Sequence, residues 1–139
     1  WVPPRSPAPL IQEDLWPNEW KILVACILLN LTTRTQVETV IYDLFAKWPD
    51  ATSLAAADEH LLSELLKPLG MYKRRAKSLK RMSSEYLANS WTTAKDLYGC
   101  GKYADDCWRI FCKGDWKNVH PEDHALNFYH DWLSNREAA

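Results

Sequence analysis

Glycine is scarce in this sequence, with only four among 139 residues, which argues against long flexible loops. No apolar stretch is long enough to cross a membrane, and no signal peptide is visible at the start. The alternation of apolar and polar residues that marks half-buried strands is missing as well. We therefore expect no membrane partner and an all-α fold.

Neither sign of charge predominates, because 17 basic residues oppose 18 acidic ones and the formal net charge is −1. That balance argues against a nucleic-acid partner, but binding depends on where the charges lie. One short segment concentrates six basic residues: Lys73, Arg74, Arg75, Lys77, Lys80 and Arg81. A solvated helix face is the common meaning of such a run, and a contact with a DNA backbone is the alternative.

The length fits a single domain, residues 1–139, and a hydrophobic content of 47% is typical of a globular protein with a real core. All four cysteines lie in apolar or helical segments or beside a turn: Cys26, Cys100, Cys107 and Cys112. We expect buried free thiols at these positions and hence a reducing, intracellular compartment.

Helical periodicity recurs along the chain behind an extended, proline-rich lead-in over residues 1–18. Segment 19–30 is apolar almost all round, which predicts a helix buried in the middle of a bundle. Segment 73–88 is amphipathic, with Ala76, Leu79, Met82, Tyr86 and Leu87 predicted to face inward and the basic residues outward. Further helices are predicted at 35–48, 52–57, 58–66, 94–97, up to 112, and 121–135.

A Gly-x-Gly turn, Gly99 to Gly101, separates two short predicted helices and is followed by Lys102. Two glycines allow a tight backbone turn, and the unpaired N–H groups at the start of the next helix can face a phosphate. An ordinary turn between helices is the other interpretation. With its flanking helices and lysine, segment 92–112 is interpreted as a helix-hairpin-helix that contacts a DNA backbone without reading sequence.

Asp123 follows Pro121, a residue that suits the first position of a helix, and is therefore predicted in a first turn. Acidic residues often occupy first turns only because they stabilise helices. Alternatively, a carboxylate held there can face a cationic transition state, as glycosidic bond cleavage requires. A zinc site is a weaker alternative for this region, because no familiar ligand spacing links Cys112, His120, His124 and His130. No metal site is predicted.

Several strings carry a resemblance to a known family. They are LYGCGKY (97–103), RIFC (109–112), VHPEDH (119–124), PPRSP (3–7), LLN followed by Thr32, LLKPLG (65–70) and YHDWL (129–133). Over essentially the whole chain, and with these strings in the family's order along it, the sequence closely resembles the thymine DNA glycosylases linked to methyl-CpG-binding domains. These enzymes belong to the helix-hairpin-helix DNA glycosylase superfamily.

This resemblance implies two helical lobes with the active-site cleft between them, and a role for individual residues. Asp123 corresponds to the catalytic carboxylate, while Gln12 and Tyr103 correspond to contacts with the flipped pyrimidine. The wedge into the duplex and the contacts with the strand of the orphaned guanine are assigned to Leu31, Leu69 and Met71. The DNA backbone contacts are expected from Gly99, Gly101, Lys102, Lys73, Arg74 and Arg75.

The implied activity is hydrolytic removal of thymine or uracil opposite guanine in double-stranded DNA, by a nuclear enzyme that acts as a monomer. Bifunctional relatives carry a lysine nucleophile where this chain has Tyr103, so no strand cleavage is expected. The cysteine spacing does not suit an iron–sulfur cluster. No cofactor is expected to be required, and the hairpin carbonyls are a candidate site for a structural monovalent or divalent cation.

Two positions depart from the pattern of vertebrate members of the family, which have an arginine in place of Leu31 and a lysine in place of Ala125. Both changes remove a positive charge near the expected pocket. Two other function classes stay open: a DNA-binding module without catalysis, and a helical protein-interaction domain. Neither the preference between thymine and uracil nor dependence on CpG context follows from the sequence.

Overall fold

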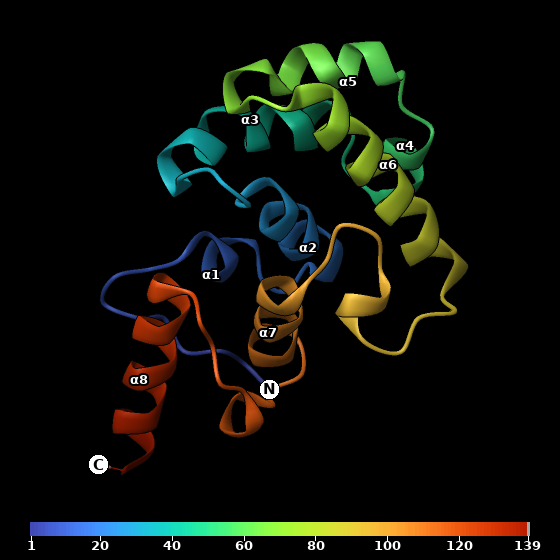
Figure 1. Cartoon of the computed structure of the whole chain (residues 1–139). Helices are drawn as coiled ribbons and strands as arrows, with labels where there is room; N and C mark the ends of the chain where they lie inside the picture. The colour runs from blue at the N-terminus through green and yellow to red at the C-terminus, as the bar shows by residue number, and fades with distance from the viewer. Residues whose placement is uncertain (139) are drawn as a thin grey trace.

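The computed structural model describes residues 1–138, and this part of the chain forms helices and no strand (Figure 1). Ala139, the last residue of the predicted domain, lies outside the described residues. The α-helices are α1 (Ile11–Leu15), α2 (Glu19–Leu28), α3 (Arg34–Lys47), α4 (Ala51–Ala55), α5 (Glu59–Leu66), α6 (Tyr72–Ala88), α7 (Lys102–Phe111) and α8 (His124–Ala138). Three 3₁₀ turns accompany them: η1 (Lys67–Leu69), η2 (Ala94–Asp96) and η3 (Trp116–Asn118).

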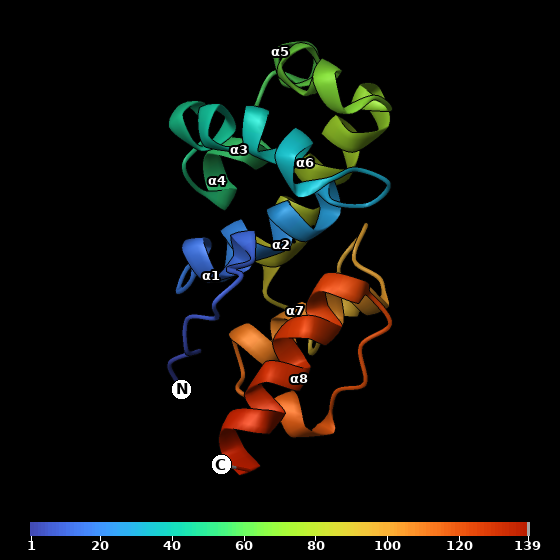
Figure 2. The ribbon, with the colours of Figure 1, turned by 90° about the vertical axis from the view of Figure 1, so that its left-hand side faces the viewer.

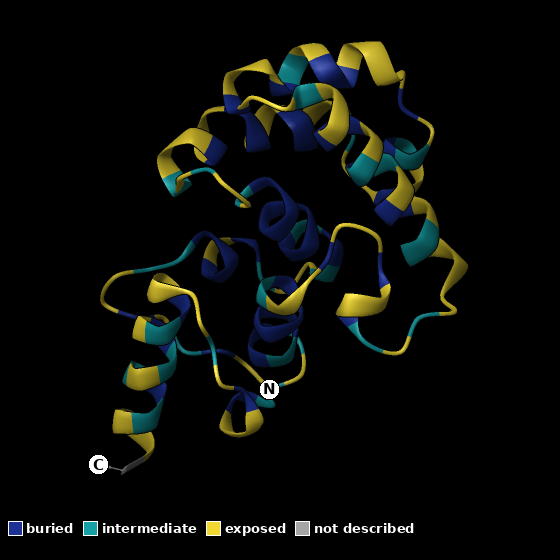
Figure 3. Ribbon diagram, viewed as in Figure 1, coloured by how far each residue is buried: buried dark blue, intermediate teal, exposed yellow. Residues whose placement is uncertain are grey.

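Helix α2 lies between two lobes, with α3 to α6 above it and α1, α7 and α8 below it in Figure 1. The seven residues from Ile22 to Leu28 are all at most 6% exposed, and Figure 3 shows the helix buried on every side. A fully buried Ile, Leu or Val contributes about 1.5–3 kcal/mol. The five such residues in α2 therefore contribute about as much as the whole net stability of a typical domain, about 5–15 kcal/mol.

The upper lobe forms from helices whose starts are fixed by capping side chains. Thr33 caps α3 and accepts a hydrogen bond from the Gln36 N–H at 3.2 Å. Asp50 and Asp58 cap α4 and α5 in the same way, at 2.8 and 3.0 Å. Satisfying these first-turn N–H groups stabilises short helices that local propensity alone would leave marginal. Helix α6 packs against both α4 and α5 and completes the lobe.

The lower lobe joins segments from both ends of the chain, and both termini lie in it (Figures 1 and 2). The ring of Tyr129 in α8 is fully buried and packs on Phe111 of α7, with ring centroids 4.8 Å apart. Its hydroxyl donates a hydrogen bond to the Pro4 carbonyl at 2.7 Å. This one side chain thus holds the N-terminal segment, α7 and α8 together.

The structure corrects three details of the predicted helices. The lead-in does not run to residue 18, because α1 occupies Ile11–Leu15. In α6, Leu87 is 48% exposed instead of facing inward. Neighbours on a helix point about 100° apart, so Leu87 cannot share the inward direction of Tyr86. Helix α8 starts at His124, later than predicted, and runs to Ala138.

None of the helices in residues 1–138 combines the length and the apolar character needed to cross a lipid bilayer. All four cysteines are free; Cys26, Cys100 and Cys107 are buried, as predicted, while Cys112 is half-buried. Burial raises the pKa of the Cys100 and Cys112 thiols to about 12. Because the thiolate is the reactive form, these cysteines are chemically quiet in the folded protein.

We expect thiol labelling to report this burial directly. With a pKa near 12, only about one in ten thousand molecules carries a Cys100 thiolate at pH 8. A thiol reagent such as dithionitrobenzoate should therefore react far more slowly with the native protein than with a cysteine peptide. Four thiols should react promptly once the protein is unfolded in guanidinium. Rapid labelling of even one thiol in the native state would contradict the structure.

Candidate active site

A cleft of about 620 Å³ opens beside the C-terminal end of α2. Its walls bring together segments far apart in the sequence: the start of α1, the loop after α2, the start of α3, the hairpin, and the start of α8. The predicted site residues that line it are Gln12, Leu31, Gly99, Gly101, Lys102, Tyr103 and Asp123. The prediction of a single site drawn from both ends of the chain therefore agrees with the geometry.

Gln12 and Tyr103 form the polar floor of this cleft. The Gln12 side chain is 1% exposed, and its Nε2 donates a hydrogen bond to the Tyr103 hydroxyl at 2.7 Å. The same nitrogen lies 3.5 Å from Cys107 Sγ and 3.8 Å from Cys26 Sγ. This arrangement leaves the side-chain oxygen of Gln12, Oε1, and the Tyr103 hydroxyl hydrogen unused by the described residues. An acceptor and a donor thus remain for a ligand with both kinds of group.

Tyr103 is held in its neutral form by this environment. Burial raises the pKa of its hydroxyl far above the ordinary value, and the neighbouring Cys107 and Cys26 thiols act in the same direction. The hydroxyl consequently remains a hydrogen-bond donor across the whole physiological pH range.

Asp123 stands immediately before α8, not within its first turn as the sequence predicted. Its Oδ2 accepts a hydrogen bond from the Leu126 N–H at 2.9 Å, and its carbonyl accepts one from the Asn127 N–H, also at 2.9 Å. The carboxylate thus acts as a helix cap, which fixes its orientation. The residue is exposed and lines the cleft, so the rest of the carboxylate faces open space.

Lys102 has a role that the sequence did not indicate. Its Nζ lies 2.6 Å from Asp106 Oδ2 and donates a hydrogen bond to the His120 carbonyl at 2.7 Å. This contact ties the segment that carries Asp123 to the first turn of α7. Lys102 was predicted as a DNA backbone contact, and its ammonium is already paired within the protein.

The hairpin glycines have different functions. Gly99 has φ +81°, a left-handed conformation that side chains disfavour, and a Cβ there would lie 3.5 Å from Ile27 Cδ1. Gly101 caps α7 with an extended backbone, and a Cβ there would meet nothing within 4 Å. Gly99 therefore makes the turn against α2, while Gly101 leaves the start of α7 open to an approaching group.

Two exposed apolar side chains stand on loops with strained backbones. Leu31 has φ +61° and is 81% exposed, and Met71 has φ +45° and is 44% exposed. A non-glycine residue in this region costs about 1–2 kcal/mol. Leu69, predicted beside Met71 in the same role, is only 6% exposed and packs in the core. That prediction is corrected, because a side chain committed to the core cannot press against DNA.

The basic segment in α6 also divides into two kinds of residue. Lys73 and Arg74 are exposed, as a backbone contact requires. Arg75 is 5% exposed and points inward, where Nε donates to the Gly70 carbonyl at 2.8 Å and Nη1 to the Asn30 carbonyl at 3.0 Å. The prediction that Arg75 binds a phosphate is therefore wrong, since its guanidinium is occupied inside the protein.

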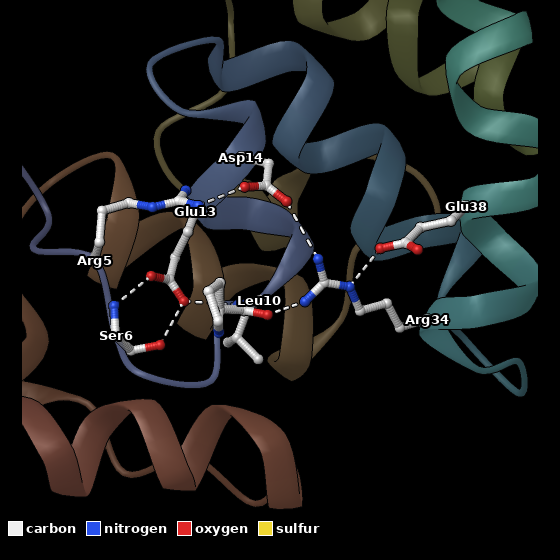
Figure 4. Close-up of polar contacts among 8 residues, drawn as sticks. Arg5, Ser6, Leu10, Glu13, Asp14, Arg34 and Glu38 are labelled. Carbon is white, nitrogen blue, oxygen red and sulfur yellow. Dashed lines mark hydrogen bonds and ion pairs between the residues drawn. The ribbon is translucent and has the colours of Figure 1, made fainter.

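The position of Gln12 depends on a polar network that the sequence analysis missed (Figure 4). Glu13 is 6% exposed, and its carboxylate accepts hydrogen bonds from the Ser6 N–H at 2.7 Å, the Ser6 hydroxyl at 2.8 Å and the Leu10 N–H at 2.6 Å. These bonds fold the lead-in back onto α1. A five-residue helix has too few periodic positions to be visible in the sequence.

Arg34 extends this network to the start of α3, as Figure 4 shows. It begins α3 in the upper lobe, yet it bonds to the Pro9 carbonyl and pairs with Asp14 at 3.2 Å. Asp14 also pairs with Arg5 at 2.7 Å, and Arg34 pairs with Glu38 at 2.5 Å. The start of α1 is thus tied both to the lead-in and to the opposite lobe.

Within residues 1–138, no three His, Cys, Asp or Glu side chains are grouped so that they could hold a metal ion. His130, one of the residues weighed for zinc, instead contacts the Trp116 carbonyl through Nε2 at 2.7 Å. The cleft thus combines the hydrogen-bonding groups of Gln12 and Tyr103 with the exposed carboxylate of Asp123.

Residues 24–132 match the family described as HhH-GPD superfamily base excision DNA repair protein. The chain belongs to this superfamily. The match includes the hairpin and the carboxylate of the cleft, and the predicted family and the predicted all-α fold are both confirmed.

Curated members of the superfamily include clear sequence relatives. A methyl-CpG-binding domain protein 4-like protein of Arabidopsis thaliana is 49% identical over 136 residues, which are 98% of this chain and 31% of that protein. A thymine-DNA glycosylase of Aeropyrum pernix is 37% identical over 93 residues, 62% of this chain and 42% of that protein. This chain thus spans about a third to two fifths of these relatives.

Solved structures support the fold. A thermostable thymine-DNA glycosylase superposes with a TM-score of 0.66 at 18% identity, covering 82% of this chain and 65% of that one. An endonuclease III trapped as a covalent intermediate with DNA gives a TM-score of 0.60 at 18% identity, covering 72% of this chain and 55% of that one. At this level of identity the likeness concerns the helical architecture.

Replacing Glu13 should show how far the lead-in network stabilises the domain. Glu13→Ala removes a buried acceptor of three hydrogen bonds, and we expect a loss of about 2–4 kcal/mol in the free energy of unfolding. Glu38→Ala, at an exposed ion pair, is the matched control and should change stability little. Urea unfolding monitored by tryptophan fluorescence measures both. Equal effects of the two variants would contradict the assigned role of Glu13.

Proposed function

We propose that this chain is a monofunctional DNA glycosylase that hydrolyses the N-glycosidic bond of thymine or uracil opposite guanine. One observation carries the proposal: the exposed carboxylate of Asp123 lines the same cleft as the buried Gln12 and the half-buried Tyr103. Membership of a base excision repair superfamily and similarity to a thymine-DNA glycosylase support it. A protein-interaction domain would need neither a cleft nor a free carboxylate within it.

The polar floor of the cleft suits a pyrimidine edge. Thymine and uracil present carbonyl acceptors and an N–H donor at their Watson–Crick edge, and Gln12 and Tyr103 offer an acceptor and a donor in return. To reach them the base must leave the duplex, and a mispaired base costs least to extract. Because the base must be extracted before it is cut, the lower cost of extracting a mispaired base favours G·T and G·U mispairs over normal pairs.

Asp123 would act on the sugar. As the bond between C1′ and the base nitrogen breaks, its electron pair leaves with the base and the sugar becomes oxocarbenium-like. A fixed carboxylate stabilises that positive charge. Water then adds at C1′, and its proton passes to the Asp123 carboxylate. The hydrogen bond from Leu126 N–H to Oδ2 keeps the group oriented for both tasks.

The side chains beside Asp123 support hydrolysis without strand cleavage. A lyase needs an amine that forms a Schiff base with the sugar. Tyr103 occupies the position of the lysine nucleophile in bifunctional relatives and has no amine. The Nζ of the neighbouring Lys102 is engaged within the protein by Asp106 and by the His120 carbonyl.

The protein–DNA interface of this proposal surrounds the cleft. Lys73 and Arg74 would contact phosphates, the open start of α7 at Gly101 would receive another, and Leu31 and Met71 would enter the duplex as apolar wedges. We propose that one monomer acts on nuclear DNA. A structural cation at the hairpin carbonyls stays a prediction.

The decisive assay uses a duplex with one G·T or G·U mispair, treated with the wild-type chain, with Asp123→Asn, or with Glu122→Gln as the neighbouring control. We expect strand breaks after alkali for the wild type and the control. Asp123→Asn should lower the single-turnover rate by roughly a thousandfold or more, because it removes the charge that faces the transition state.

Other outcomes of this assay would overturn parts of the proposal. Breaks without alkali would reveal a lyase nucleophile and refute monofunctional hydrolysis. Full activity of Asp123→Asn would remove Asp123 from the mechanism. Tight DNA binding without any base loss would leave a DNA-binding module as the function.

Salt dependence tests the proposed contact of Lys73 with the DNA backbone. We expect Lys73→Ala to weaken binding to any duplex and to lower the slope of log K against log salt concentration by about one. Lys47, at the end of α3 about 20 Å from the cleft end of that helix, gives the control variant Lys47→Ala. Identical slopes for Lys73→Ala and the wild type, measured by fluorescence anisotropy, would place Lys73 outside the interface.

A further inference from the structure

The two strained loops that carry Leu31 and Met71 come from distant parts of the chain. Leu31 follows α2, and Met71 precedes α6, forty residues later. Each presents an exposed apolar side chain on a left-handed, non-glycine backbone. Such conformations persist only where surrounding contacts determine them. Contacts from surrounding residues must therefore stabilise the backbone of both loops.

Arg75 is the residue that contacts both. Its Nε donates to the Gly70 carbonyl at 2.8 Å, next to Met71, and its Nη1 donates to the Asn30 carbonyl at 3.0 Å, next to Leu31. One buried guanidinium therefore bridges the residues that directly precede the two exposed side chains. The guanidinium is planar, and its N–H donors cannot move relative to each other. It therefore sets the distance between the loop of Leu31 and the loop of Met71.

The environment of Arg75 is costly for a charge. The side chain is 5% exposed, and no ion pair within residues 1–138 involves it. It also lies in the first turn of α6, where the helix dipole disfavours a cation. A buried charge paired only with carbonyls stabilises a fold less than an apolar side chain of similar size would. A contribution to the free energy of folding therefore does not explain why an arginine occupies position 75.

We propose that Arg75 is a positioning residue that fixes Leu31 and Met71 at one spacing, so that both enter the duplex together when the base is extracted. This inference rests on the proposed function, because it assigns those side chains to base extraction. Holding the loops before DNA arrives avoids the entropy cost of ordering them during the reaction. Arg75 acts through the loops and touches neither phosphate nor base.

The conservative variant Arg75→Lys provides the sharpest test, since a lysine keeps the charge but cannot reproduce the rigid two-donor bridge. We expect the single-turnover excision rate on a G·U duplex to fall roughly 10- to 100-fold, as misplacement of about 1 Å can cause. A 2-aminopurine beside the mispair should report weaker base extraction by a smaller rise in fluorescence. Arg136→Lys, at an exposed arginine near the end of α8 and outside the proposed interface, is the matched control and should behave like the wild type.

Two further measurements separate positioning from other roles. In a Leu31→Ala, Met71→Ala background, adding Arg75→Lys should reduce the rate by less than about threefold, because the side chains that it positions are gone. The slope of log K against log salt concentration should stay unchanged. A fully additive loss would indicate a merely structural role, and a slope lowered by about one would indicate a direct phosphate contact. Either result would overturn the inference.

Amide hydrogen exchange supplies a readout that needs no activity. Arg75→Lys, or Arg75→Gln if the lysine variant does not fold, should speed exchange in segments 30–32 and 70–72 together and leave the α2 core protected. Unchanged exchange in both segments would refute the bridge. A wild-type chain that excises no base would instead refute the proposed function, while exchange and 2-aminopurine fluorescence would still decide the role of Arg75.

Discussion

The burial of α2 on all sides is the constraint on which the other features of this structure depend. Both lobes pack against this one helix, so their relative position follows from its contacts. Its C-terminal end leads into the loop of Leu31, and Cys26, near that end, forms part of the cleft wall. A helix without an exposed face cannot shift against one lobe without disturbing the other. The cleft is therefore a fixed feature of the fold.

Polar contacts then place individual side chains within that frame. Glu13 orders the lead-in and so positions the neighbouring Gln12, while Lys102 holds the segment before α8 and so positions Asp123. Gln12, Tyr103 and Asp123 each keep at least one polar atom without a partner among the described residues, and their neighbours hold them in place. This division is common in binding sites, because a group that is fully satisfied within the protein has nothing left to offer a ligand.

The sequence was informative where a pattern is long or a motif is specific. The apolar run of α2, the amphipathic α6, the hairpin glycines and the cluster of Gln12, Tyr103 and Asp123 in one cleft agree with expectation. The sequence analysis failed for Arg75 and Leu69, which it placed at the DNA surface and which are buried. Helical periodicity does not show which way a side chain points in a turn between two helices or at the start of a helix. Helix α1 escaped notice because its order comes from Glu13 and Ser6, a tertiary contact without a local signal.

The position of Gly99 beside Ile27 has a consequence for how far apart two contacts with DNA would lie. A Cβ added at Gly99 would lie 3.5 Å from Ile27 Cδ1, so the hairpin faces the last turn of α2, which leads into the loop of Leu31. A phosphate held at the hairpin and a base step entered by Leu31 would thus be separated by a fixed length of protein. Under the proposed function, the nucleotide to be extruded would be selected by its distance along the strand from the phosphate at the hairpin.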